Sequence, residues 1–225
     1  MVNIIVNSPP RPDSRLVERF KNIHPSELGH VIEYGFMDTD IRLVGGGARY
    51  VVGPALTVRI TPTDSAMVYK ALDMAQPGDV IVIDNQGERR HACWGEITTL
   101  NALRKQVAGA VVDGPVTDSR RIVELDFAAF SRSSTNLTTK LIGFRGDINV
   151  PVQCGGVTVK PGDIVCANED GVLVVPLETA ASLIEKAEGA EKTEETRQAR
   201  IARGDSFMDI MGIQPYIDKM NVTEL

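Results

Sequence analysis

The chain has 225 residues, a formal net charge of −6 and 43% hydrophobic residues, which is enough apolar material for a real core in one large or two small domains. Because it has no run of lysine or arginine, this balance argues against a nucleic-acid surface, whose affinity rests on neutralising phosphates. Small anionic substrates stay possible, since the local field of a site need not follow the net charge.

Cysteine content and apolar runs indicate the compartment. Cys93, Cys154 and Cys166 are an odd number with no close pair, which fits neither a disulfide framework nor a zinc cluster. We therefore expect a cytoplasmic protein. The first residues lack the basic segment and the apolar length of a signal peptide. No stretch approaches the roughly 20 apolar residues of a membrane span, so a membrane is not an expected partner.

The N-terminal part of the chain predicts an arm followed by two helices. Prolines break residues 7–13, so residues 1–13 are expected to lie as an arm over the body or over a neighbouring subunit. Apolar residues at helical spacing predict a pair of helices within 14–36.

A β–α–β passage is predicted next. Residues 50–60 alternate as in a strand, and Gly53-Pro54 indicates a bulge or bend within it. A helix capped by Ser65 follows, and residues 80–84 form a continuous β-branched run that is typical of a strand buried on both sides.

The stretch 95–118 is where we expect a site. Its pattern predicts a helix that opens with the carboxylate of Glu96, a turn at Gly109, a buried strand at 110–112 and a tight turn. That turn carries Asp113, Gly114 and Asp118. In this order the start of the helix and the end of the strand can meet across one cleft.

The second half predicts a short helix, several strands and a long final helix. Gly155-Gly156 marks a hairpin, and the Pro-Gly-Asp phrase at 160–171 echoes that at 76–87 as a similar turn into a strand. The final helix, at about 177–203, is apolar at Ala181, Ile184 and Ala187. Its charged second half is either solvated or packed on a neighbour. Because no linker divides the middle, residues 1–225 are expected to form one domain that ends in this helix and a tail, 177–225.

The residues at 95–118 and four further motifs resemble the RraA-like family. These motifs are GPALTV at 53–58, PGDVIVID at 77–84, GGVTVKPGD at 155–163 and DGVLVVP at 170–176. The family contains divalent-metal-dependent 4-hydroxy-4-methyl-2-oxoglutarate aldolases and the regulator of ribonuclease activity A. The resemblance implies an α/β fold, a three-layered β/β/α swivelling sandwich with a central mixed sheet, assembled as a homotrimer or a dimer of trimers.

The family's aldolases share an acidic residue that is followed, after twenty residues, by Arg-Asp. Here Glu96 stands at the acidic position, and the pair is Thr117-Asp118, so the spacing is kept and the arginine is not. A threonine hydroxyl offers one neutral hydrogen-bond donor in place of the charged, two-pronged guanidinium of arginine. Losing a charged donor to a developing oxyanion commonly lowers the rate by roughly 10²–10³. Four arginines are candidates to replace it: Arg59, Arg89, Arg120 and Arg121.

The resemblance also implies roles for the site residues. Asp118 would ligate Mg²⁺ or Mn²⁺, mostly through water, and Glu96 would support the hydrated metal. The backbone N–H groups around Gly95, Ile97 and Thr98 would bind the carboxylate of a 2-oxo acid, and Thr117 would take the arginine's place beside the keto oxygen. A helix N-terminus also favours an anion on physical grounds alone.

Each of these residues also has an interpretation that needs no ligand. Asp118 suits the N-cap of the helix that follows it, and Glu96 is stabilised by the dipole of its own helix. His91 has no identified partner, and Cys93 beside Trp94 is expected to pack. The family brings a C-terminal glutamate from the adjacent subunit to the metal waters. The loose matches here are Glu194 and Glu195, which stand with Glu191 in an acidic cluster that otherwise solvates a helix.

Two hypotheses of function follow. The first is a metal-dependent lyase on a small 2-oxo acid, acting by retro-aldol cleavage or by decarboxylation of the oxaloacetate type through a pyruvate enolate. The second is a non-catalytic binding or regulatory protein on the same scaffold, because a fold does not fix a function.

Overall fold

The computed structural model describes residues 6–8, 11–45 and 50–220. The strands are β1 Arg42–Leu43, β2 Val51–Ile60, β3 Val80–Asp84, β4 Gly109–Val116, β5 Ala129–Ser134, β6 Gly146–Ile148, β7 Val152–Cys154, β8 Val157–Val159, β9 Ile164–Asn168 and β10 Gly171–Val175. The helices are α1 Ser14–Phe20, α2 Pro25–Gly29, α3 Ala66–Met74, α4 Glu96–Arg104, α5 Ser119–Glu124, α6 Leu177–Ala202, α7 Phe207–Met211 and α8 Gln214–Ile217.

A single mixed sheet organises the molecule, with strand order β1-β5-β4-β3-β2-β9-β10. Strands β2 to β5 run parallel, as expected for a β–α–β passage, whereas β1, β6, β9 and β10 pair antiparallel with their neighbours. Strand β2 is shared: Val51–Pro54 pair with β9, and the residues from Ala55 onward pair with β3. The bend expected at Gly53-Pro54 thus coincides with a change of partner. Strands β1 and β10 contact each other, so the sheet is nearly closed.

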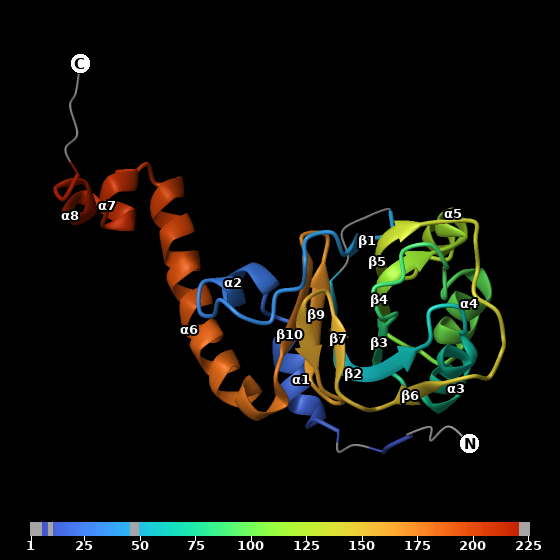
Figure 1. Ribbon diagram of the computed structural model, residues 1–225. Helices are drawn as coiled ribbons and strands as arrows, with labels where there is room; N and C mark the ends of the chain where they lie inside the picture. Colours follow the sequence, from blue (N-terminus) through green and yellow to red (C-terminus); the bar gives the residue numbers. More distant parts are fainter. Residues whose placement is uncertain (1–5, 9–10, 46–49, 221–225) are drawn as a thin grey trace.

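The layers form the β/β/α arrangement that the resemblance to the RraA-like family implied. Helices α3, α4 and α5 cover one side of the parallel strands, and β7 to β10 lie across the other side (Figure 1). Helices α1, α2 and α6 add a cover on the outer face of β9 and β10. Strand β3 is buried on both faces, with Ile81 and Ile83 toward the helices and Val80 and Val82 toward the second layer of strands.

Two local predictions are wrong in an informative way. Asp113 and Gly114 form no tight turn; they continue β4, and the pairing with β5 shifts register between Val112 and Pro115. Glycine is needed because a Cβ at position 114 would lie 2.7 Å from the side-chain nitrogen of Asn85. Ser65 does not cap α3 with its side chain, since the Asp64 carboxylate accepts the Ala66 N–H instead, at 3.0 Å.

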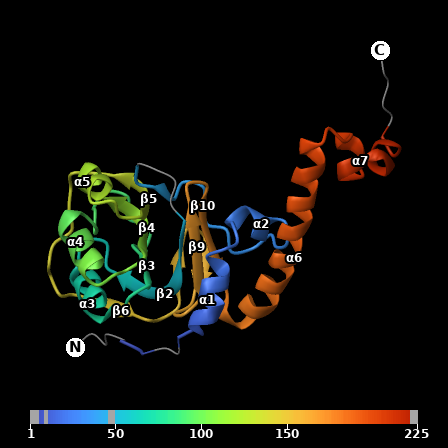
Figure 2. The same cartoon turned by 180° about the vertical axis from the view of Figure 1, so that it is seen from behind.

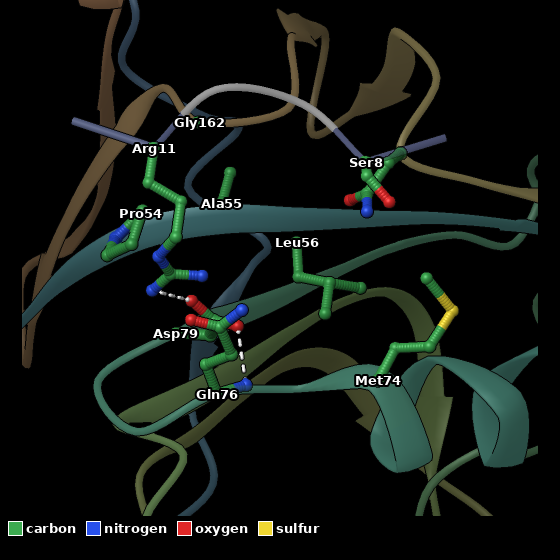
Figure 3. A pocket seen from close by; sticks show the side chains of 10 residues that line it. Ser8, Arg11, Pro54, Ala55, Leu56, Met74, Gln76, Asp79 and Gly162 are labelled. Carbon is green, nitrogen blue, oxygen red and sulfur yellow. Dashed lines mark hydrogen bonds and ion pairs between the residues drawn. The ribbon is translucent and has the colours of Figure 1, made fainter. Parts of the chain in front are cut away.

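The two Pro-Gly-Asp segments fold alike. Gly78 and Gly162 both have positive φ, +84° and +87°, as the third position of a type II turn requires. In each turn the aspartate, Asp79 or Asp163, accepts the N–H of the residue three places earlier, at 2.8 and 2.7 Å. The second oxygen of each carboxylate has a different partner. That of Asp163 accepts the Leu177 N–H at the start of α6, whereas that of Asp79 pairs with Arg11 (Figure 3).

The N-terminal arm lies against the body where it is described. The Asn7 N–H donates to the Ile148 carbonyl, 3.1 Å away, and Arg11 reaches the buried Asp79 across a cavity of about 120 Å³. Residues 1–5 and 9–10 of the predicted arm lie outside the described residues.

The C-terminal helix leaves the body of the molecule. Its first half packs through Ala180, Leu183, Ile184 and Ala187, so Ala180 and Leu183 rather than the expected Ala181 complete the buried face. Its second half projects away with α7 and α8, on the side opposite to α4 (Figures 1 and 2). Within the described residues, no helix combines the length and the apolar content that crossing a bilayer requires.

Candidate functional site

A cleft of about 220 Å³ lies where the start of α4 meets the end of β4. Its walls are residues 92–98, Thr117 and Asp118, the loop residues 138–141, and Ser65 with Tyr69 from the start of α3. All six predicted site residues line this cleft: Gly95, Glu96, Ile97, Thr98, Thr117 and Asp118. The structure thus brings the two ends of the 95–118 stretch together.

Backbone contacts fix the two walls against each other. The Thr117 N–H donates to the Trp94 carbonyl at 2.8 Å, and the Glu96 N–H donates to Oδ2 of Asp118 at 3.1 Å. Trp94 is itself held in the core, because its ring stacks on Phe127 and its indole N–H donates to the Thr99 hydroxyl. The site residues therefore stand on a rigid base.

Gly95 is required by space rather than by backbone conformation. Its φ of −165° is extended and open to any residue. A Cβ at this position, however, would lie 2.5 Å from Cγ2 of Thr117 and 2.7 Å from Oδ2 of Asp118. The absence of a side chain is what lets the Asp118 carboxylate reach the first turn of α4.

The first turn of α4 keeps two backbone donors available. The Gly95 N–H donates to the Thr98 hydroxyl at 2.9 Å, and the Glu96 N–H goes to Asp118. Among the described residues, the N–H groups of Ile97 and Thr98 have no acceptor. Two unpaired amides at the positive end of a helix dipole form a good seat for a carboxylate.

Asp118 is held in a strained conformation and does not cap α5. Its backbone lies in the left-handed region, with φ +52° and ψ +36°, and its side chain makes no hydrogen bond to the N-terminus of that helix. The carboxylate turns instead toward α4 and the Thr117 hydroxyl. Backbone strain of this kind costs on the order of 1–3 kcal/mol and concentrates at functional sites. The capping interpretation therefore does not account for this aspartate.

Sequence comparison places this geometry in a family. A family model described as Aldolase/RraA matches residues 29–174. The chain belongs to the RraA-like family. A protein of Halalkalibacterium halodurans, provisionally named as a 4-hydroxy-4-methyl-2-oxoglutarate aldolase, is 39% identical over 170 residues, which are 76% of this chain and 78% of that protein.

Other members of the RraA-like family carry names of two kinds. The 4-hydroxy-4-methyl-2-oxoglutarate aldolase of Thermus thermophilus is 34% identical over 132 residues, 59% of this chain and 79% of that protein. The crystal structure of RraAS2 from Streptomyces coelicolor, described as an unusual member of the RNase ES inhibitor RraA protein family, superposes with a TM-score of 0.74. That comparison covers 84% of this chain and all of RraAS2, at 29% identity. The relatives' names thus support a lyase-type enzyme and also include an inhibitor family.

None of the four candidate arginines lines the cleft of this RraA-like chain. Arg121 comes nearest, because its Nε donates to Oε1 of Glu96 at 2.9 Å, but it also pairs with Glu124. Arg120 points outward and pairs with Glu124, and Arg59 binds Asp84 and Asp147. Arg89 is exposed and lies near Asp38.

Lys140 is the cation that sequence reasoning missed. It lines the cleft from the loop 138–141, and within the described residues it forms no ion pair. Residues 138–141 form an irregular loop without the hydrophobic periodicity that identifies helices and strands. The signal that could have found it is the polar Thr-Thr-Lys run before three exposed apolar residues, Leu141, Ile142 and Phe144.

Three other candidate residues do not act as catalytic groups in this cleft. His91 pairs with Glu88, at 3.1 Å, and does not line the cleft. Cys93 does line it, but burial raises the pKa of its thiol to about 12, so it is no thiolate nucleophile. Asp113 pairs with Arg132 and accepts the Gly155 N–H at 2.9 Å, which anchors the β7–β8 hairpin.

The C-terminal glutamates lie away from this cleft. Glu194 pairs with Arg197 within the projecting half of α6, on the other side of the molecule from α4. Glu191 and Glu195 belong to the same half of the helix. None of the three contributes to the cleft of its own chain.

The donor set at the cleft fits a hydrated divalent cation. Asp118, Glu96 and Thr117 offer only hard oxygen atoms, and the carboxylate of Asp118 is seated in the cradle that Gly95 leaves open. Within the described residues, no group of three acidic, cysteine or histidine side chains could hold a metal ion alone. Such a sparse set suits Mg²⁺ or Mn²⁺ with most of its waters retained, rather than Zn²⁺ or a closed Ca²⁺ cage.

Proposed function

We propose that this protein is a divalent-metal-dependent carbon–carbon lyase on a small 2-oxo acid. It would act by retro-aldol cleavage of a 4-hydroxy-2-oxo acid or by decarboxylation of the oxaloacetate type, and both reactions release pyruvate through its enolate. The observation that carries the proposal is the strained Asp118 carboxylate beside the free Ile97 and Thr98 N–H groups in one cleft.

Each side chain has a defined task in this proposal. The N–H groups of Ile97 and Thr98 bind the substrate carboxylate and so orient the keto group toward Asp118. Asp118 would hold Mg²⁺ or Mn²⁺, and Glu96 would hold its waters. When bound, such a metal supplies an electrophile that neutralises charge developing on the keto oxygen. Arg121 keeps the Glu96 carboxylate in place.

Two residues, Thr117 and Lys140, would together replace the arginine of the family's aldolases. The Thr117 hydroxyl donates to Oδ1 of Asp118 at 3.3 Å, and it would supply one neutral donor by turning this proton toward the substrate. Lys140 would supply a positive charge from the loop 138–141 that lines the same cleft. An ammonium is a point charge without the planar fork of a guanidinium, so we expect a different preference in substrate rather than a complete loss of the reaction.

Pyruvate release tests the proposal. The native protein is assayed on 4-hydroxy-4-methyl-2-oxoglutarate and on oxaloacetate, with Mg²⁺, with Mn²⁺ and with EDTA. We expect release that needs the metal and stops with EDTA. No turnover of any 2-oxo acid tested, by a protein that is folded, would contradict it.

The replacement of the family's arginine by Thr117 favours a second candidate, a binding or regulatory protein on the same scaffold. This alternative predicts no metal binding by calorimetry and repeated enrichment of one protein partner from the native source. Metal-dependent turnover would exclude it as the main function.

We also propose a homotrimer or a dimer of trimers, in which the projecting α6–α8 segment packs on a neighbouring copy. Ile201, Phe207, Met211 and Tyr216 expose apolar side chains on this segment, which supports a covered surface. Light scattering should give three or six times the mass of one chain, and a monomer would contradict the proposal.

A further inference from the structure

The loop that forms the outer wall of the cleft is not held by hydrophobic packing. Leu141, Ile142 and Phe144 are 68%, 58% and 59% exposed, so their side chains bury little apolar surface. An irregular loop without buried side chains must be held by its polar contacts, because otherwise nothing offsets the entropy of ordering it.

The polar contacts of residues 140–144 converge on one short segment between β2 and α3, whereas Thr139 before them donates its N–H and its hydroxyl to the Ala92 carbonyl, at 2.9 and 3.1 Å. The Lys140 N–H donates to the Thr63 carbonyl at 2.8 Å, and the Lys140 carbonyl accepts the Ser65 N–H at 3.0 Å. Asp64 lies between Thr63 and Ser65 in the sequence, and its carboxylate accepts the N–H groups of Ile142 at 3.1 Å and Phe144 at 2.6 Å. The loop is thus clamped around Asp64 at both ends.

Asp64 is suited to this task by its burial and charge. It is 2% exposed, and its carboxylate also accepts the Ala66 N–H at the start of α3. Burial alone would raise the pKa of this carboxyl group, but hydrogen bonds from four backbone N–H groups hold it below its ordinary value. The group is therefore ionised at neutral pH, when hydrogen bonds to it are at their strongest.

We propose that Asp64 is a positioning residue that holds residues 140–144 as the outer wall of the cleft and thereby fixes Lys140 opposite the first turn of α4. Lys140 then meets the end of the substrate farther from the carboxylate that α4 binds, and it selects a 2-oxo acid with a second anionic group. The selection by Lys140 rests on the proposed lyase function, whereas the clamp does not.

Amide hydrogen exchange tests the clamp without any assay of activity. In Asp64→Asn the side chain keeps its shape and one acceptor, and asparagine caps a helix as well as aspartate does. The side-chain NH2 group of the asparagine, however, cannot accept a hydrogen bond, so one of the backbone N–H groups that Asp64 binds loses its acceptor. We expect peptides covering 140–144 to exchange at least about tenfold faster than in the native protein, because the loop loses its hydrogen bonds to a charged group.

The matched control is Asp73→Asn, which removes an exposed carboxylate of α3 that pairs with Lys70. Its loop exchange should equal that of the native protein. Unchanged loop exchange in Asp64→Asn, with native melting behaviour, would overturn the clamp. A variant that melts early is replaced by Asp64→Ser, which keeps the cap and still removes the charge, and the same two outcomes decide.

Kinetics test the selection by Lys140. Lys140→Met keeps the length of the side chain and removes its charge, and we expect it to raise KM for oxaloacetate about tenfold while kcat changes less. Asp64→Asn should raise KM in the same direction, and the double variant should be little worse than Lys140→Met alone, because both changes act on one contact. Additive effects, or a fall in kcat alone, would contradict action through Lys140.

The failures of the two ideas are distinguishable. A native protein without turnover contradicts the lyase and leaves the exchange result to decide on the clamp. A native protein with metal-dependent turnover and an Asp64→Asn variant with unchanged KM contradicts the positioning role alone.

Discussion

At the scale of single residues, the site depends on the space that Gly95 leaves beside Asp118. That space lets the Asp118 carboxylate turn from α5 to the first turn of α4. The interval from Glu96 to Asp118 predicted that these carboxylates share a cleft, and both line it. It could not predict the left-handed backbone conformation of Asp118.

Gly95→Ala should therefore damage the site through crowding. A Cβ within 2.7 Å of Asp118 forces apart the two walls, which we expect to cost roughly 1–3 kcal/mol of stability and most of the activity. Gly189→Ala is the control, because that glycine lies in open space within α6, where alanine should stabilise by about 0.5–1 kcal/mol. Thermal unfolding and pyruvate release measure both. A fully active Gly95→Ala would contradict the crowded cradle.

The cysteines should be inert toward alkylation near neutral pH. Burial raises the pKa of Cys93 and of Cys166 to about 12 and that of Cys154 well above its ordinary value, so at pH 8 each group stays a neutral thiol. We expect no modification of the folded protein by iodoacetamide over an hour, as measured by mass spectrometry. Rapid labelling of Cys93 would indicate a thiolate in the cleft and a different chemistry.

At the scale of elements, periodicity predicted the regular parts and missed the irregular ones. The buried strand at 80–84, the hairpin at Gly155-Gly156 and the long final helix are confirmed, because each has a local pattern that decides it. The loop at 138–144 has no such pattern. Its place depends on Asp64, which is far away in sequence, so Lys140 could not be assigned to the cleft.

Asp64 should make stability sensitive to acid. Its pKa in the folded state is lowered, so its contribution is present above the unfolded-state pKa of about 3.9 and is lost as pH falls through the folded-state pKa. We expect Asp64→Asn to lower the free energy of unfolding at pH 7, with the difference from the native protein shrinking toward pH 2. Urea unfolding across this range measures it, and a difference that is independent of pH would argue against an ionised clamp.

At the scale of the whole molecule, the mixed sheet brings the start of α4 and the end of β4 together on one side and carries α6 on the other. The order of strands and helices predicted the parallel centre. It could not predict that β1 returns to the edge beside β5 and contacts β10, because the pairing of a two-residue strand is set by the closed sheet and not by its own sequence. The membership of the RraA-like family agrees with this architecture.

The most direct measurement is Mg²⁺-dependent pyruvate release by Asp118→Gly beside the native protein. Glycine accepts the left-handed backbone without strain, so the fold should stay as stable within about 1 kcal/mol while the carboxylate is lost. Gln106→Gly, at another left-handed position outside the cleft, is the control and should keep full activity. We expect a loss of at least about 100-fold in Asp118→Gly alone. Activity retained within about threefold would contradict a metal-binding role for Asp118 and with it the proposed lyase site.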